Sequence, residues 1–117
     1  SPTSPENLRH ETAWVYSQGA PPTFKGDLYY YSVDHDLTKT AEQIDTSTTA
    51  VYVLCGEYDW SSTPVMARAL ADRIKGAQYR DMPGLGHFPM SEHPTLFLEY
   101  IRPVLAEIGA RDNGTSK

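Results

Sequence analysis

The sequence has few of the residues that hold small domains together covalently or through metal ions. Cys55 is the single cysteine among 117 residues, so an internal disulfide is excluded and the chain is not a disulfide-stapled secreted domain. This favours a reducing compartment such as the cytoplasm, with secretion as the alternative. Paired cysteines, an H-E-x-x-H segment and a phosphate-binding loop are also missing, so we expect no metal ion, nucleotide or other cofactor.

A net basic charge and long apolar runs are missing as well. The formal net charge is −5, whereas a protein that binds nucleic acid presents a basic face. No stretch of the sequence is long and apolar enough to cross a membrane. We therefore expect neither a nucleic-acid partner nor a membrane span. The 39% hydrophobic content suits one ordinary globular domain.

The first half of the chain, residues 1–49, shows little clean periodicity. Residues 12–18 predict a short helix. Residues 25–37 contain three consecutive tyrosines and are compatible with either a helix or an extended segment. We expect short helices joined by loops, without a sheet.

From residue 50 the pattern becomes regular. The run "AVYVLC" (50–55) is apolar and β-branched, which is typical of a buried strand in a parallel sheet. Thr63 and Pro64 are typical of the N-cap and first position of a helix, and Gly76 is placed to end it. The apolar face of this helix is formed by Val65, Met66, Ala69, Leu70 and Ile74.

The end of the chain predicts a weaker strand over residues 77–82 and a last helix from Pro94. Pro103 is expected to kink or divide this helix, because proline lacks a backbone donor. Residues 111–117 are expected to form a disordered tail. The side chains expected to face the core are Phe97, Leu98, Ile101, Leu105 and Ile108.

The order strand, helix, strand, helix over residues 50–110 predicts an α/β fold with two neighbouring parallel strands. Two parallel strands do not make a stable sheet, because a parallel sheet needs both faces covered and normally has more strands. We therefore expect these elements to be one edge of a larger sheet whose other strands lie on a separate segment.

One acidic residue and one histidine follow the two predicted strands. Asp59 lies in "GEYDWSSTP" and His87 lies in "GLGHFPM". In open parallel sheets, ligands bind at the carboxyl edge of the strands, and both residues are expected there. A carboxylate that orients an imidazole is half of a nucleophilic triad. The sequence therefore predicts Asp59 as the orienting acid and His87 as the base, with Glu57 as the nearest rival to Asp59.

These two loops resemble those of the α/β-hydrolase superfamily. "GEYDWSSTP" looks like its acid loop, and "GLGHFPMSEHP" looks like its histidine loop. The family order is nucleophile, acid, histidine, so the resemblance covers the C-terminal part of the fold, roughly residues 50–108. Residues 1–49 would then be the end of a helical cap.

The resemblance implies a cofactor-free hydrolase that acts on a small, largely apolar ester or lactone. C–C bond hydrolysis, epoxide opening and dehalogenation use the same scaffold. The sequence has no G-x-S-x-G elbow for the nucleophile. Cys55 is expected to be buried and inert, and Ser61 and Ser62 to be turn or capping residues. We therefore expect a second polypeptide segment to supply the nucleophile and the rest of the sheet.

Aromatic residues are the candidates for a substrate pocket, with plain packing as their alternative role. They are Trp14, Phe24, Tyr30, Trp60 and Phe88. Among the polar residues, His93 is expected at the start of the last helix and Glu92 on the surface. The cluster Asp34-His35-Asp36 is expected to be a solvated loop, since three adjacent residues rarely point at one ion. Two other functions remain open, namely acyl transfer on the same scaffold and a non-catalytic interaction domain.

Overall fold

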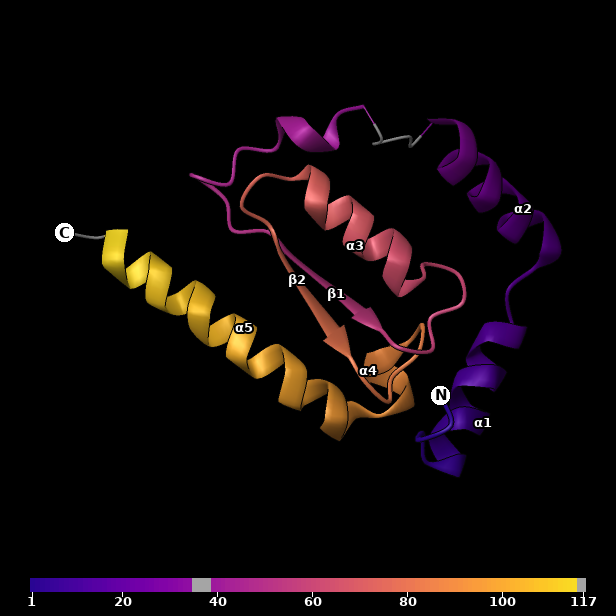
Figure 1. Cartoon of the computed structure of the whole chain (residues 1–117). Helices are drawn as coiled ribbons and strands as arrows, with labels where there is room; N and C mark the ends of the chain where they lie inside the picture. Colours follow the sequence, from indigo (N-terminus) through magenta and orange to yellow (C-terminus); the bar gives the residue numbers. More distant parts are fainter. Residues whose placement is uncertain (35–38, 116–117) are drawn as a thin grey trace.

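The chain is described by a computed structural model that covers residues 1–34 and 39–115. Helices surround a sheet of two parallel strands, so the architecture is α/β as predicted (Figure 1). The elements are, in order, α1 (Glu6–Ser17), α2 (Pro21–Tyr29), the π-helix η1 (Tyr30–Asp34), the 3-10 helix η2 (Ala41–Gln43), β1 (Tyr52–Gly56), α3 (Pro64–Arg73), β2 (Gln78–Met82), α4 (Pro89–Glu92) and α5 (Pro94–Thr115).

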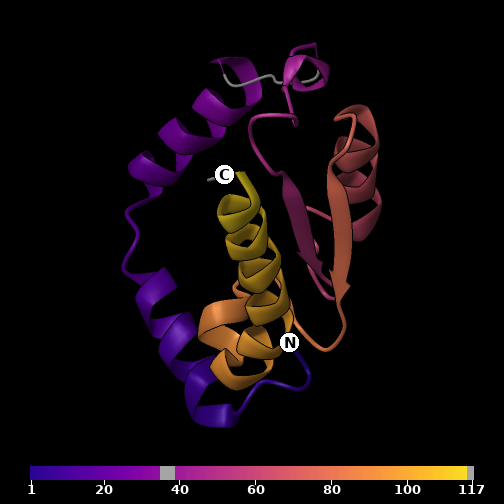
Figure 2. The ribbon, with the colours of Figure 1, turned by 90° about the vertical axis from the view of Figure 1, so that its left-hand side faces the viewer.

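The two strands pair over their full length, from Tyr52 opposite Gln78 to Gly56 opposite Met82. Helices α3 and α5 lie on opposite faces of the sheet (Figure 2). Successive strand residues point to opposite faces. Accordingly, Arg80 of β2 pairs with Glu107 of α5 at 2.6 Å, while Asp81 pairs with Arg68 of α3 at 3.0 Å.

Helix α3 begins where its sequence predicts and ends at Arg73, three residues before the predicted stop at Gly76. The Oγ1 of Thr63 accepts a hydrogen bond from the Met66 amide at 3.4 Å, and Pro64 occupies the first turn. After the helix, Gly76 has a φ of +88°, a conformation that only glycine adopts readily.

The core is small, and two residues expected in it are exposed. Its buried apolar side chains are Ala41, Cys55, Ala71, Ile74, Met82, Leu85 and Val104. The expectation that Leu98 and Leu105 of α5 face the core is wrong, because they are 41% and 57% exposed. Two strands span only about 10 Å across the sheet, about the diameter of one helix. The sheet is therefore too narrow to cover the full apolar face of α5.

Helix α5 is longer than predicted. Pro103 lies inside it without dividing it, and the helix continues to Thr115, where a disordered tail was expected from residue 111; residues 116–117 lie outside the described ranges. The guanidinium of Arg111 donates hydrogen bonds to the carbonyls of Thr46 and Ser47 at 2.8 and 2.7 Å. These bonds tie the last turns of α5 to the segment before β1.

The N-terminal part is helical and lies partly at the carboxyl ends of the strands. Helix α1 begins at Glu6, earlier than predicted, and the described part of the ambiguous tyrosine segment, residues 25–34, is helical in α2 and η1. Helix α1 packs against α4 and lies below α2 in Figure 1. Hydroxyls of Ser1 and Thr3 donate to the Gly84 carbonyl, and that of Ser4 donates to the Glu92 carbonyl. Within the described ranges, no helix combines the length and apolarity needed to span a membrane.

Candidate active site

Asp59 and His87 meet at the carboxyl edge of the sheet, as the sequence predicts. Asp59 follows β1 and His87 follows β2. The His87 Nδ1 atom lies 3.0 Å from both carboxylate oxygens of Asp59. The carboxylate therefore holds the imidazole through one ring nitrogen.

The Asp59 carboxylate is itself held by the backbone of its loop. Its Oδ1 accepts hydrogen bonds from the amides of Ser61 and Ser62, both at 2.9 Å, so these two serines are turn residues as predicted. Burial acts to raise the pKa of Asp59, but the hydrogen bonds from the two amides and from His87 outweigh it and hold the pKa below its ordinary value. A carboxylate that stays ionised can orient an imidazole and stabilise its protonated form.

The acid loop and the histidine loop are in direct backbone contact. The Tyr58 amide donates to the Leu85 carbonyl at 2.9 Å. A Cβ atom at Gly56 would lie 2.4 Å from the Gly86 carbonyl oxygen, so no larger residue fits at this position. The close approach at Gly56 sets the spacing between the two loops.

Glu92 fixes the backbone on both sides of His87, which corrects the expectation that it lies on the surface. It is only 7% exposed. Its carboxylate accepts the Gly86 amide at 3.0 Å and the Phe88 amide at 2.9 Å. The single turn of α4 brings Glu92 back to these amides. A carboxylate four residues after Phe88 was the sequence signal for this contact.

The imidazole of His87 lies beside two aromatic rings. The His87 ring lies edge-on to Phe88 with centroids 4.7 Å apart, and Trp60 lies 6.3 Å away. One third of the His87 side chain is exposed. Among the residues that the structure describes, none hydrogen-bonds to Nε2 of His87, so this nitrogen is available to take a proton from another group.

A pocket of about 380 Å³ contains His87 and two of the five aromatic candidates, Trp60 and Phe88. Phe24 lines a separate pocket of about 480 Å³ between the end of α1 and α2. Trp14 and Tyr30 line neither pocket and are 69% and 51% exposed. The structure therefore gathers only part of the predicted aromatic set around His87.

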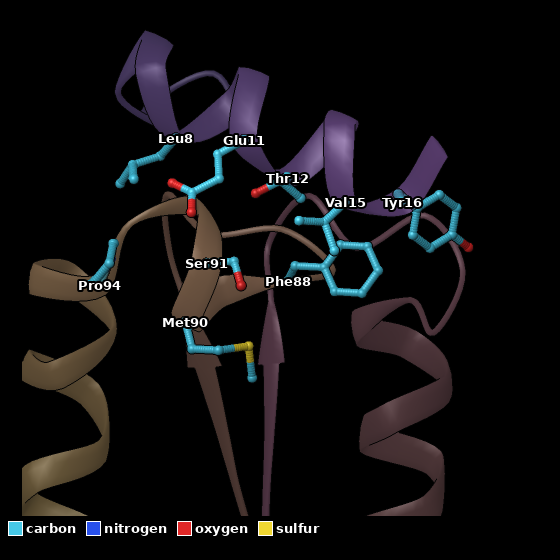
Figure 3. A pocket seen from close by; sticks show the side chains of 9 residues that line it. All are labelled: Leu8, Glu11, Thr12, Val15, Tyr16, Phe88, Met90, Ser91 and Pro94. Carbon is cyan, nitrogen blue, oxygen red and sulfur yellow. The ribbon is translucent and has the colours of Figure 1, made fainter. Parts of the chain in front are cut away.

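Two aromatic residues that line the His87 pocket, Tyr58 of the acid loop and Tyr16 of α1, were not predicted from the sequence. Tyr16 has the wider set of contacts. It lines both of these pockets and a third of about 370 Å³ between α1 and α4. In that third pocket, side chains of α1 face Phe88, Met90 and Ser91 (Figure 3). The Tyr16 ring lies 5.5 Å from Phe88 and 6.3 Å from Phe24. Its only sequence signal was its place in the predicted helix over residues 12–18.

The remaining polar candidates have structural roles. Cys55 is buried and donates through Sγ to the Ser62 carbonyl, and burial raises the pKa of its thiol. Glu57 accepts the Gly84 amide at 2.9 Å and does not contact His87. His93 is at the start of α5 as predicted, where its Nδ1 accepts the Leu96 amide at 3.2 Å.

Residues 1–34 and 39–115 contain no cluster of three or more His, Cys, Asp or Glu side chains that could hold a metal ion. In the predicted loop Asp34-His35-Asp36, Asp34 is instead the last residue of the π-helix η1, and His35 and Asp36 lie outside the described residues. No hydroxyl or thiol of the described residues hydrogen-bonds to His87, whose side-chain partner is the Asp59 carboxylate. In comparisons with known proteins, no family model, curated protein or solved structure matches this chain.

Proposed function

We propose that this chain supplies the acid and the base of a cofactor-free hydrolase of the α/β-hydrolase type. Asp59 is the orienting acid, His87 is the base, and a second polypeptide segment carries the nucleophile and the rest of the sheet. The observation that carries this proposal is the contact of His87 Nδ1 with both Asp59 oxygens at 3.0 Å, beside an open pocket.

The reaction would follow the two-step course of a nucleophilic triad. The nucleophile attacks the carbonyl carbon of a small, largely apolar ester or lactone while Nε2 of His87 takes its proton. The imidazolium, stabilised by Asp59, returns this proton to the leaving alcohol as the C–O bond breaks. His87 then deprotonates a water molecule that attacks the acyl group and releases the acid.

Exposed apolar surface on α3 and an unpaired edge of β1 support the proposal that a second segment completes the sheet. Val65 and Met66 on α3 are 78% and 60% exposed, although they belong to the apolar face of an amphipathic helix. Within the described residues, β1 pairs with β2 alone, so one edge of this apolar strand has no neighbour. Further strands beside β1 would cover both features.

The test begins with native mass spectrometry of the purified protein to identify a tightly held partner. Hydrolysis of p-nitrophenyl butyrate by the complex is then compared between the wild type and His87→Ala. We expect a loss of turnover of about a thousandfold or more, as in other triads that lose the base. His10→Ala is the matched control, because His10 lies exposed on α1. Near-full turnover by His87→Ala would overturn the proposal.

A non-catalytic scaffold is the second candidate, because no nucleophile of the described residues contacts His87. The residue at the elbow of the partner segment decides between the two. Ser, Cys or Asp there supports the enzyme, whereas Gly or Ala supports a binding role. Acyl transfer would be recognised by product analysis, since an added alcohol would then be acylated in preference to water.

A further inference from the structure

We propose, building on the function proposed above, that the His87 pocket takes a flat aromatic substrate that also carries an anionic group such as a carboxylate. In this arrangement, the ring lies among the aromatic side chains of the pocket and the anionic group pairs with Arg9. The bond to be cleaved then points toward His87.

The walls of the pocket are suited to a flat ring. Tyr16 from α1, Tyr58 and Trp60 from the acid loop, and Phe88 from the histidine loop all line it. Three of these rings are largely open to solvent, with Tyr16, Tyr58 and Trp60 exposed by 55%, 44% and 80%. Aromatic side chains bind other rings by offset stacking and edge-to-face contacts. The pocket volume of about 380 Å³ is in the range of small-molecule sites.

The charge in the pocket favours an anion. Arg9 of α1 lines the pocket and has no ion pair or side-chain hydrogen bond with any residue that the structure describes. A guanidinium binds a carboxylate through two parallel hydrogen bonds, which are among the stronger polar contacts in proteins.

The two carboxylates nearby do not compete for this role. Glu92 already accepts the Gly86 and Phe88 amides and lies 3.0 Å from the amino group of Ser1. Asp59 is occupied by two backbone amides and by His87. Among the described residues that line the pocket, Arg9 is therefore the exposed charged side chain without a protein partner, and its guanidinium is open to a ligand.

Different elements supply the anion-binding group and the base of the pocket, as such a substrate requires. Arg9 and Tyr16 come from α1, whereas Trp60, His87 and Phe88 come from the loops at the edge of the sheet. The anion-binding group and the base thus come from different elements, and each of these elements also contributes aromatic rings. A substrate between these elements can contact Arg9 at one end and present its ester to His87 at the other.

The test measures binding of 1-naphthoate to the purified protein, compared with neutral 1-naphthamide and with non-aromatic cyclohexanecarboxylate. Amide chemical shifts report where each probe binds. We expect 1-naphthoate to bind about tenfold more tightly than either of the other probes, which corresponds to one good charged contact or one stacked ring. The shifts should be largest in the acid and histidine loops.

Arg9→Gln should weaken naphthoate binding to the level of naphthamide and leave naphthamide binding unchanged. Arg9→Lys, which keeps the charge without the paired donors, should fall between these limits. Arg73→Gln on α3 is the matched control and should bind like the wild type. Equal affinity for naphthoate and naphthamide, or a preference that survives Arg9→Gln, would overturn the proposal.

Binding and turnover separate this inference from the proposed function. Loss of the naphthoate preference, together with His87-dependent hydrolysis of p-nitrophenyl butyrate, would overturn the substrate class alone. Selective naphthoate binding by a protein whose complex does not need His87 for turnover would overturn the proposed function and keep the anionic aromatic site.

Discussion

Asp59 and Glu92 are both carboxylates beside His87, and their tasks differ. Asp59 contacts the imidazole directly and holds one ring nitrogen. Glu92 contacts the backbone on either side of His87 and fixes the loop that carries it. Asp59 therefore sets the orientation of the ring, whereas Glu92 sets the position from which the ring extends.

The lowered pKa of Asp59 makes part of the folding stability depend on pH. Because the folded-state pKa lies below its ordinary value of 3.8, this contribution is fully present above that value and is lost as the pH falls through the folded-state pKa. In Asp59→Asn, which keeps an oxygen acceptor for the Ser61 and Ser62 amides, we expect the free energy of unfolding to fall less steeply below about pH 4. Urea unfolding at stepped pH measures this difference. Parallel pH profiles would contradict the prediction.

Replacing Glu92 by glutamine should destabilise the histidine loop. One carboxylate oxygen becomes an NH2 group that faces a backbone donor instead of accepting from it. We expect the free energy of unfolding to fall by about 1 to 3 kcal/mol, the cost of a buried group without its partner. Urea unfolding measures the loss, with Glu99→Gln on the exposed side of α5 as the control. Equal stability of the two variants would mean that Glu92 does not hold the loop.

At the scale of elements, the site depends on how closely two loops approach at the end of a narrow sheet. The end of β1 at Gly56 touches the histidine loop at Gly86. Helices α3 and α5 are joined to opposite faces of β2 through Arg68 and Glu107. The loops thus meet on a sheet whose orientation is fixed from both faces.

Gly56→Ala should be strongly destabilising, since its Cβ would lie 2.4 and 2.8 Å from the carbonyl oxygens of Gly86 and Leu85. We expect a loss of about 2 kcal/mol or more, and a displaced His87 signal in NMR spectra. Gly26→Ala is the control, because nothing lies within 4 Å of its added Cβ. In the interior of α2, alanine should stabilise the helix by about 0.5 to 1 kcal/mol. Unfolding curves that rank the two variants in the opposite order would refute this assignment.

The elements around the site could be predicted where the signal is local. The apolar run up to Cys55 and the Thr63 cap each depend on a few adjacent residues, and both are confirmed. Gly76 was expected to end α3, but the helix already ends at Arg73. The Asp59–His87 contact could be predicted because parallel strands bring their carboxyl ends to one edge.

The features that could not be predicted from the sequence depend on contacts between distant parts of the chain. Ser4 reaches the carbonyl of Glu92, a residue 88 positions away, and no local pattern indicates such a bond. The exposure of Leu98 and Leu105 could not be predicted either, because their periodicity describes a helix face without stating what covers it.

At the scale of the whole molecule, the chain exposes more surface than its mass requires. Its accessible surface is 8499 Å², whereas a compact protein of this mass exposes about 6400 Å². Its radius of gyration is 16.6 Å, against about 13 Å for a compact domain of this length. Both differences agree with apolar faces on α3 and α5 that no described part of the chain covers.

In the isolated chain, the apolar face of α3 should therefore be exposed to solvent and should tolerate polar substitutions. We expect Val65→Ser together with Met66→Gln to change the free energy of unfolding by no more than about 0.5 kcal/mol per site, as for other exposed positions. The same change should lower the fluorescence of bound 8-anilinonaphthalene-1-sulfonate, a dye that reports exposed apolar surface. Ala71→Ser, at a position of α3 that is only 5% exposed, should instead reduce stability. Unchanged dye binding with reduced stability in the double variant would contradict this picture.

The contact between Gly56 and Gly86 has a consequence for the order in which a reactive centre is assembled. Because the two loops bond to each other directly, the imidazole and its carboxylate are aligned by this chain alone. Their rotational entropy is lost during folding and is not lost again when a further group arrives. In the hydrolase that we propose, an incoming nucleophile would meet a base that is already preorganised, so only the approach of the nucleophile would have to be ordered.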